Sequence, residues 1–172
     1  VVTSGAGAHG SFAQSAGGSG SSVSPEFKAE VAAFFDVLVS GAGAHGIFAQ
    51  SAGDGMGSIL VQVFPNVTVQ GGGAASVSGA ESGAAIFVKQ GTRSTINNDG
   101  TIRSIDGSSG VAIRAVDSDL TINNDGLITG EIINDGVSGS PITLVNYESG
   151  VINTGQLVDV DLEVHLGDIV IG

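Results

Sequence analysis

Apolar residues recur two positions apart in a series of short runs along this chain. Because successive side chains of a β-strand point to opposite faces, a period of two predicts strands, whereas a helix needs a period near 3.6. Glycine-rich and Asn-Asp-Gly segments, which form tight turns at low steric cost, separate the runs. The pattern therefore predicts an all-β chain of short strands. Five of the runs align with one another: SFAQ (11–14), IFAQ (47–50), IFVK (86–89), IRAV (113–116) and ITLV (142–145).

Longer segments of the sequence also repeat. SGAGAHGSFAQSAGG begins at Ser4 and SGAGAHGIFAQSAGD at Ser40, and TINNDG begins at both Thr95 and Thr121. Like strands return after one long cycle instead of being joined by two-residue hairpins, which favours a coil over an antiparallel sandwich. We therefore predict a parallel β-solenoid with about three strands per coil, including a strand at 75–77. Stacked coils should place four residues in one internal ladder: Ile47, Ile86, Ile113 and Ile142.

The segment 19–36 interrupts the repeats. Within it, Pro25 suits the first turn of a helix, and Phe27, Val31, Phe34 and Phe35 are spaced as on one face of a helix. This spacing predicts a short amphipathic α-helix inserted between two copies of the repeat.

Phenylalanine recurs at one position of the aligned runs. Alternation places Phe12 and Phe48, and then Phe87, on the strand face opposite Ala13 and Ala49. If the small residues point inward, the phenylalanines form an outward stripe, over which we expect the inserted helix to fold. The alternative is that Phe12 and Phe48 fill the interior and the helix packs elsewhere or against another chain. The predicted contact surface comprises Phe12, Phe27, Phe34, Phe35, Phe48 and Phe87.

The C-terminal segment 157–172 has the most regular alternation in the chain. From Leu157 to Leu166, apolar residues alternate with Asp159, Asp161 and Glu163. This alternation predicts one strand with a buried Val/Leu face and a solvent-exposed acidic face, followed by a further short strand at 169–171.

Composition limits the classes of function. The chain has 172 residues of which 41% are hydrophobic, enough for the core of one domain over 1–172. Its net charge of −12 would repel phosphates, so we do not expect nucleic acid as a partner. No apolar run approaches the roughly 18 residues of a membrane helix, so the chain is not expected to span a membrane. It contains no cysteine, which excludes disulfides and thiolate metal sites.

Two pairs of residues at equivalent repeat positions offer candidate chemistry. Asp99 and Asp125 occupy the two NNDG turns, where Asp before Gly is expected for backbone reasons. His9 and His45 would stack on adjacent coils as a two-histidine metal site. No carboxylate stands beside either histidine, so hydrogen bonding to the backbone is the favoured role.

Calcium binding has two candidate sites. The GGSG segment at 17–20 lacks the aspartate of calcium-binding β-rolls. Asp159, Asp161 and Glu163 would share a cation only if another loop added oxygens, so a solvated acidic face is favoured. We therefore assign no catalytic, cofactor-binding or metal-binding residue.

The segments GAGAHGSFAQSAGG and GAGAHGIFAQSAGD, followed by VTVQGGG at 67–73, resemble the GAHGIYAQS-type repeats in passenger regions of large Gram-negative autotransporter adhesins. The resemblance implies a right-handed parallel β-helix, secreted through the inner membrane and displayed at the cell surface by a parent anchored in the outer membrane. It also implies that this chain is a piece of a passenger, with the signal peptide and the C-terminal β-barrel outside it.

The function expected from this resemblance is that of an extracellular adhesin and structural stalk. Its partner would be an unidentified glycan or protein on a host or bacterial surface, and self-association through the ends of the solenoid is a further expectation. The alternatives are a carbohydrate-active enzyme on the same fold and a purely structural spacer. Since the sequence has no convergent acid–base cluster, the adhesive module and the spacer are favoured over the enzyme.

Overall fold

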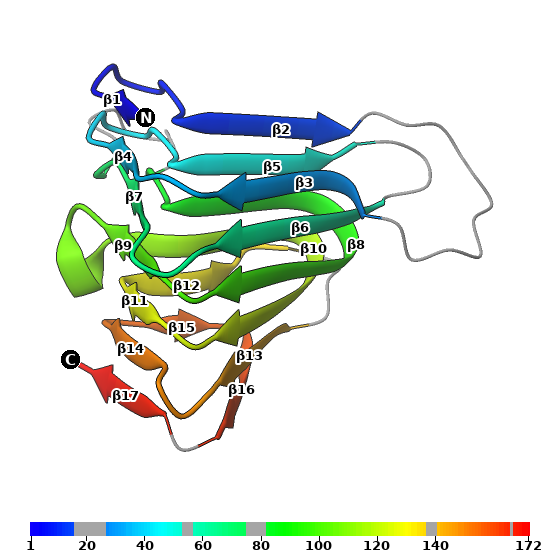
Figure 1. Ribbon diagram of the computed structural model, residues 1–172, viewed down its shortest axis with the longest axis vertical. Helices are drawn as coiled ribbons and strands as arrows, with labels where there is room; N and C mark the ends of the chain where they lie inside the picture. The colour runs from blue at the N-terminus through cyan, green and yellow to red at the C-terminus, as the bar shows by residue number, and fades with distance from the viewer. Residues whose placement is uncertain (16–26, 53–56, 75–81, 137–140, 166) are drawn as a thin grey trace.

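The fold, taken from a computed structural model, is all-β and is dominated by long parallel sheets (Figure 1). The structure describes residues 1–15, 27–52, 57–74, 82–136, 141–165 and 167–172. Every strand pair among these residues is parallel, and the described residues contain one 3₁₀ turn (η1, Gly107–Ser109) but no α-helix. The predicted all-β, parallel character is therefore confirmed.

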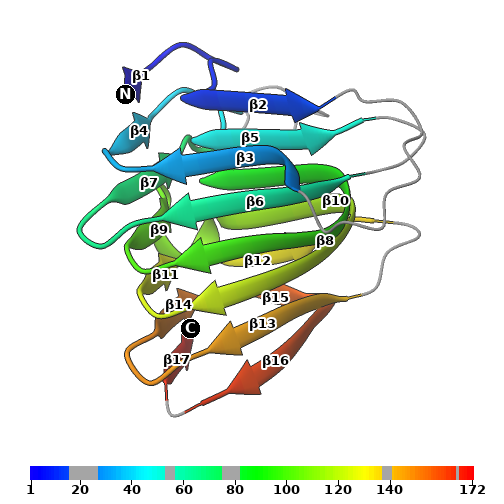
Figure 2. The same ribbon diagram turned by 45° about the vertical axis from the view of Figure 1, so that its right-hand side comes forward.

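The chain visits three stacks of strands in turn, which we call the first, second and third columns. The first column forms the seven-stranded sheet and lies along one side of the molecule in both ribbon views (Figures 1 and 2). Its strands are β1 (Val2–Thr3), β4 (Val37–Val39), β7 (Thr68–Gly71), β9 (Thr101–Ser104), β11 (Leu127–Thr129), β14 (Val151–Thr154) and β17 (Asp168–Ile171).

The second and third columns share a larger sheet because β8 and β10 are long enough to run through both. The second column contains β2 (Ser11–Ser15), β5 (Ile47–Ser51), β12 (Glu131–Asn134), β15 (Leu157–Val158) and the first halves of β8 (Ile86–Asn98) and β10 (Val111–Asn124). The third contains β3 (Phe27–Ala33), β6 (Ser58–Val63), β13 (Ile142–Asn146), β16 (Val160–Val164) and the second halves of β8 and β10.

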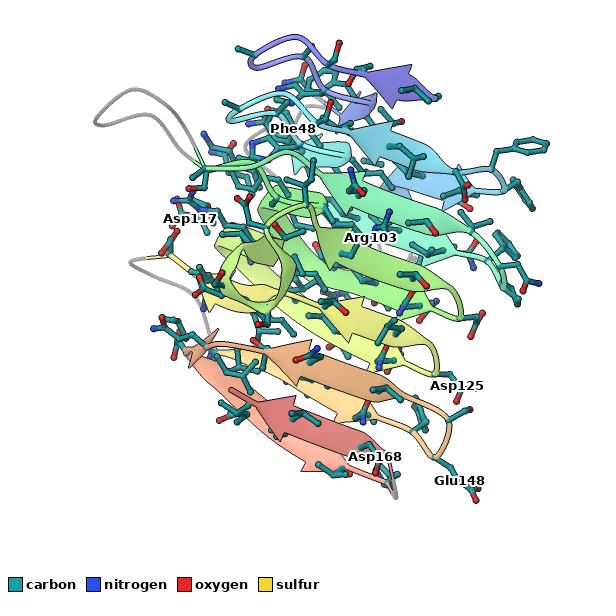
Figure 3. The ribbon with its side chains drawn as sticks, turned by 90° about the vertical axis from the view of Figure 1, so that its left-hand side faces the viewer. Phe48, Arg103, Asp117, Asp125, Glu148 and Asp168 are labelled. Atoms are coloured by element: carbon teal, nitrogen blue, oxygen red, sulfur yellow. The ribbon has the colours of Figure 1, made fainter. Side chains whose placement is uncertain are left out.

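A residue with left-handed backbone geometry marks the three passages from the second to the third column that the structure describes in full. Gln90 in β8 has φ 54°, Asp117 in β10 has φ 51°, and Asp159 between β15 and β16 has φ 52°. Such a residue reverses the local curvature of an extended chain, which lets one strand serve two sheet faces. Figure 3 views the molecule with the first column facing the reader. Asp117 lies at one edge of the molecule in this view, and Asp125, between β10 and β11, lies at the opposite edge.

The core contains a ladder of branched residues in register, as predicted for three of its four members. Ile47 pairs with Ile86 and Ile86 with Ile113, and all three side chains are fully buried. The fourth rung is Ile132, not Ile142. Gly130 joins β11 directly to β12, so β12 supplies the second-column strand and ITLV falls in the third column, where Thr143 pairs with Thr121.

The helix predicted within 19–36 is wrong for the part of that segment that the structure describes. Residues 27–33 form β3, whose backbone pairs with β6 from Phe27 to Ala33. Ala29, Val31 and Ala33 face the core with a period of two, the strand period. Pro25 and the predicted strand at 75–77 lie outside the described residues.

The single strand predicted from Leu157 to Leu166 is instead divided into β15 and β16 at Asp159. Asp161 and Glu163 are exposed, as predicted. Leu162 and Val164 are exposed as well, at 41% and 47%, so the predicted burial of the Val/Leu face is wrong for these two residues. The reason is that β16 pairs with β13 on one side only.

No helix among the described residues is long and apolar enough to cross a membrane.

Candidate functional site

Three phenylalanines stack along the second column on the side away from the core, and we call them the aromatic ladder. The register joins Phe12 to Phe48 and Phe48 to Phe87. The ring centroids of Phe12 and Phe48 are 5.1 Å apart in an edge-to-face arrangement, and those of Phe48 and Phe87 are 5.0 Å apart and stacked. Such ring pairs stabilise a fold by about 0.5–1.5 kcal/mol beyond their area burial. The predicted outward orientation is confirmed, because Ala49 and Ile47 on the opposite face belong to the main core.

Exposure along the aromatic ladder decreases from its first rung to its third. Phe12 is 55% exposed, Phe48 is half-buried, and Phe87 is only 4% exposed. The guanidinium of Arg114 lies 5.9 Å from the centre of the Phe87 ring, and its Nε is 2.6 Å from a carboxylate oxygen of Asp135. The Phe12 end of the aromatic ladder is therefore exposed to solvent, whereas the Phe87 end is covered, with the Arg114 guanidinium over the Phe87 ring.

The remaining predicted contact residues lie on a different element from the aromatic ladder. Phe27 begins β3, and Phe34 and Phe35 follow its end with exposed fractions of 61% and 83%. The Phe34 ring stacks on Phe64 with centroids 4.4 Å apart. No described part of segment 19–36 is a helix folded over the aromatic ladder. The exposed aromatic residues therefore form two separate groups, the aromatic ladder and a second group of Phe34, Phe35 and Phe64.

The two repeated histidines stack on each other at the start of the second column. The rings of His9 and His45 have centroids 5.0 Å apart and are nearly parallel at 13°. His9 Nδ1 accepts a hydrogen bond from the His45 backbone N–H at 3.2 Å, and His45 Nδ1 accepts one from Ala84 N–H at 2.9 Å. This agrees with the favoured backbone-bonding role, and it requires Nδ1 to be unprotonated in both rings.

Burial lowers the pKa of both histidines. The pKa of His45 falls from 6.5 to about 4, chiefly because burial disfavours the charged ring and further because His9 and Arg114 repel a positive charge. The pKa of His9 is lowered by burial. Both rings are therefore neutral near pH 7 and act as acceptors and stacking surfaces.

A second ladder, which we call the asparagine ladder, lies inside the third column where its strands end. Asn98 Nδ2 donates to Asn124 Oδ1 at 2.7 Å, and Asn124 Nδ2 donates to Asn146 Oδ1 at 2.7 Å. All three side chains are buried. The second Asn of each NNDG segment is the sequence signal for the first two members of this ladder. The third member, Asn146, is not predicted, because the sequence alignment assigns ITLV to the second column instead of the third.

The acidic residues do not converge on a metal site in the described part of the chain. No group of three or more His, Cys, Asp or Glu side chains is placed to hold a metal ion there. Asp125 accepts a hydrogen bond from the Ser149 hydroxyl, and Asp159 accepts one from Asn134 Nδ2 at 2.7 Å. These acids therefore have structural partners in the turns, and the GGSG segment at 17–20 lies outside the described residues.

Comparison of this chain with protein-family models, with curated proteins and with solved structures finds no match.

Proposed function

We propose that this chain is part of a right-handed parallel β-helix that acts as an adhesive stalk outside a Gram-negative cell, on a parent anchored in the outer membrane. The observation that carries the proposal is the unbroken series of parallel rungs in all three columns. Right-handedness is the expected hand because parallel connections within one sheet are right-handed in nearly all cases. The resemblance of the repeated GAGAHG segments to autotransporter passengers supports the location.

Stacked side chains support a role in which the molecule bears load. Ladders of asparagine, glutamine and aromatic residues each link successive rungs. Gln14 donates to Gln50 at 2.9 Å, and Gln50 donates to Gln90 at 2.7 Å. Because neighbouring rungs are joined by parallel backbone pairing and several of them also by side-chain hydrogen bonds, pulling along the stack has to break many bonds together.

The exposed aromatic side chains support the adhesive part of the proposal. Phe12, Phe34 and Phe35 are each more than half exposed. Large exposed aromatic rings are enriched where proteins contact partners. Strands with a single neighbour, β1 with β4 and β17 with β14, support self-association through the ends as a further part of the proposal.

The test is retention of coated beads under flow. Beads that carry the purified chain should be retained on epithelial monolayers, on matrix proteins or on bacteria more strongly than beads coated with albumin. The double substitution Phe34→Ser and Phe35→Ser should reduce retention several-fold, since both side chains are exposed and their loss leaves the core intact. The matched control is Ile105→Ser, which removes a 45% exposed apolar side chain between β9 and η1 and should leave retention unchanged.

Retention equal to that of albumin on all three surfaces would contradict the adhesive role and leave the spacer. The enzyme alternative predicts new reducing ends when the chain is incubated with soluble polysaccharides. Their appearance would replace the proposal with a carbohydrate-active enzyme.

A further inference from the structure

A polar groove lies on the outer side of the third column, away from the aromatic ladder and one rung beyond Phe64, which is the counterpart of Asp99 in the same series of turns. It encloses about 420 Å³ and is lined by Gln62, Asn97, Asp99, Asn123, Asp125 and Tyr147. We call it the amide groove. Gln62 pairs in register with Asn97 and Asn97 with Asn123, so three amide side chains from successive rungs form one row.

The remaining lining residues come from equivalent turns directly after the same strands. The backbone N–H of Asp99 donates to Val63, that of Asp125 to Asn98, and that of Tyr147 to Asn124. These three bonds repeat from rung to rung. Asp99, Asp125 and Tyr147 therefore occupy the same position on three successive rungs. Because Gln62 lies one rung before Asp99, the lining of the groove spans four rungs about 4.8 Å apart, those of β6, β8, β10 and β13.

Three side chains of the amide groove, those of Asn97, Asn123 and Asp125, are held by hydrogen bonds before any ligand arrives. Asn123 Nδ2 donates to Asn97 Oδ1 at 2.9 Å, which fixes both amides and leaves the Asn97 amide hydrogens as donors and the Asn123 oxygen as an acceptor. The hydroxyl of Ser149 bonds to Asp125. The buried asparagine ladder anchors the turns beneath. A site with fixed donors and acceptors loses little entropy on binding.

Tyr147 adds an apolar surface at one end of the groove. Its side chain is 42% exposed, and its ring stacks with His165 at 5.9 Å between centroids and 23° between planes. The ring is supported from one side while part of its surface remains open to solvent.

The lining excludes several classes of ligand. It contains two carboxylates and no Lys or Arg, so it repels polyanions. It lies on a strand face instead of a strand edge, so a peptide cannot add a strand there. Fixed amides, carboxylates and one aromatic ring instead match a ligand that offers many hydroxyl groups and one apolar face.

We propose that the amide groove binds a neutral glycan chain lying across the rungs. Its hydroxyls bond to Asn97, Asn123, Asp99 and Asp125, and one sugar ring packs on Tyr147. This inference rests on the proposed adhesive function, for which it names the class of ligand.

The test measures binding of the full chain to defined hexasaccharides. The neutral probes are maltohexaose, cellohexaose and the hexamer of N-acetylglucosamine, and the anionic probes are heparin and hyaluronan hexasaccharides. We expect binding to at least one neutral probe and to neither anionic one. Asn123→Ala and Tyr147→Ala should each weaken binding about tenfold, as loss of one good contact does. Tyr147→Phe should retain binding within about threefold, because the stacking surface remains.

The matched control is Asn153→Ala, which removes an exposed amide from β14 in the first column and should leave binding unchanged. Side-chain amide NMR signals of Asn97 and Asn123 should shift on addition of the neutral probe, which tests the site without any substitution. Binding that is unchanged in both groove variants, a preference for heparin, or no binding to any neutral probe would overturn the inference.

The bead assay separates this inference from the proposed function. If the parent chain binds no neutral probe, and beads that carry Asn123→Ala are retained like beads that carry the parent chain, the groove is rejected and the adhesive role is kept. Glycan binding that depends on Asn123 without bead retention would keep the groove and reject the adhesive role.

Discussion

At the scale of single residues, the fold disfavours the protonated form of the buried His45 imidazole. Its Nδ1 is already used as an acceptor for Ala84 N–H, and the ring lies between His9 and Phe87. A proton on Nδ1 would replace an attraction with a repulsion between two donors. Burial of the ring is the main cause of its lowered pKa of about 4, and repulsion from His9 and Arg114 lowers the pKa further.

Stability should therefore fall as the pH is lowered from 6.5 to about 4. In this window the unfolded chain binds a proton at His45 that the folded chain does not, so the free energy of unfolding rises with pH and levels off above the unfolded pKa. The His45 contribution is at most about 3 kcal/mol. Urea unfolding at pH 7.5 and at pH 4.5 measures it.

His45→Ala isolates that contribution, because Ala84 already occupies the equivalent place on the next rung. The variant should lose much of the difference between the two pH values, whereas His165→Ala, at an exposed position, should keep it. An unchanged pH dependence in His45→Ala would refute the assignment.

The left-handed residue Asp117 leads to a second prediction at this scale. Its φ of 51° is tolerated by Asn, Asp and Gly but is a genuine strain for a β-branched side chain. Asp117→Val should lower the free energy of unfolding by about 2 kcal/mol, and Asp117→Asn should be nearly neutral. Asp119→Val, at an exposed position two residues further along β10, is the control and should cost less than about 0.5 kcal/mol. Equal losses at 117 and 119 would mean that backbone strain does not limit the bend.

At the scale of elements, the segment beginning at Phe27 satisfies two periodicities at once. Phe27, Val31 and Phe34 fit a helix, while Ala29, Val31 and Ala33 fit a strand. The strand is adopted because β6 offers a full row of backbone partners, which no local pattern reveals. The phenylalanine spacing is therefore not evidence of a helix face, and Phe34 and Phe35 are left exposed beyond the end of β3.

The division of Leu157–Leu166 has a similar origin. The apolar and acidic alternation correctly predicts extended backbone, but it does not reveal that Asp159 turns the chain from the second to the third column. Gln90 makes the same turn in β8. Because glutamine is not a typical turn residue, tertiary pairing and not local propensity selects this bend.

The asparagine ladder allows a prediction about neighbouring residues of one strand. Asn124 is fully buried and bonds to both Asn98 and Asn146, whereas Asn123 faces outward and bonds to Asn97. Asn124→Ala should lower the free energy of unfolding by about 2–3 kcal/mol because it leaves buried amide groups without partners. Asn123→Ala should cost less than about 1 kcal/mol. Chemical denaturation of the two variants compares them directly, and similar losses would contradict a structural role for the buried ladder.

At the scale of the whole molecule, periodicity is sufficient to predict an all-β parallel stack, but not the register of its later rungs. Ile47, Ile86 and Ile113 are correctly aligned because the strands that carry them begin with similar sequences. Ile142 is misplaced because the later coils are shorter and less alike. Of the candidate site, the outward aromatic ladder follows from alternation. The amide groove does not, because its residues come from turns and strands that only the three-dimensional stacking brings together.

The stacking also predicts how stability is distributed along the molecule. Strands β9 and β11 have parallel neighbours on both sides, β14 lies next to the last rung, and β17 has a neighbour on one side only. In a stack whose units contact only their neighbours, opening should begin at the ends and require most free energy in the middle. Native-state hydrogen exchange should therefore show a gradient along the first column. Backbone amides at Ile102 and Ile128 should be protected most, Ile152 less, and Ile169 least, with a total range on the order of 100-fold. The inner three side chains are all fully buried, so a difference between Ile152 and the other two reports position in the stack rather than solvent contact. Equal protection at Ile102, Ile128, Ile152 and Ile169 would instead indicate that the entire stack unfolds as one cooperative unit.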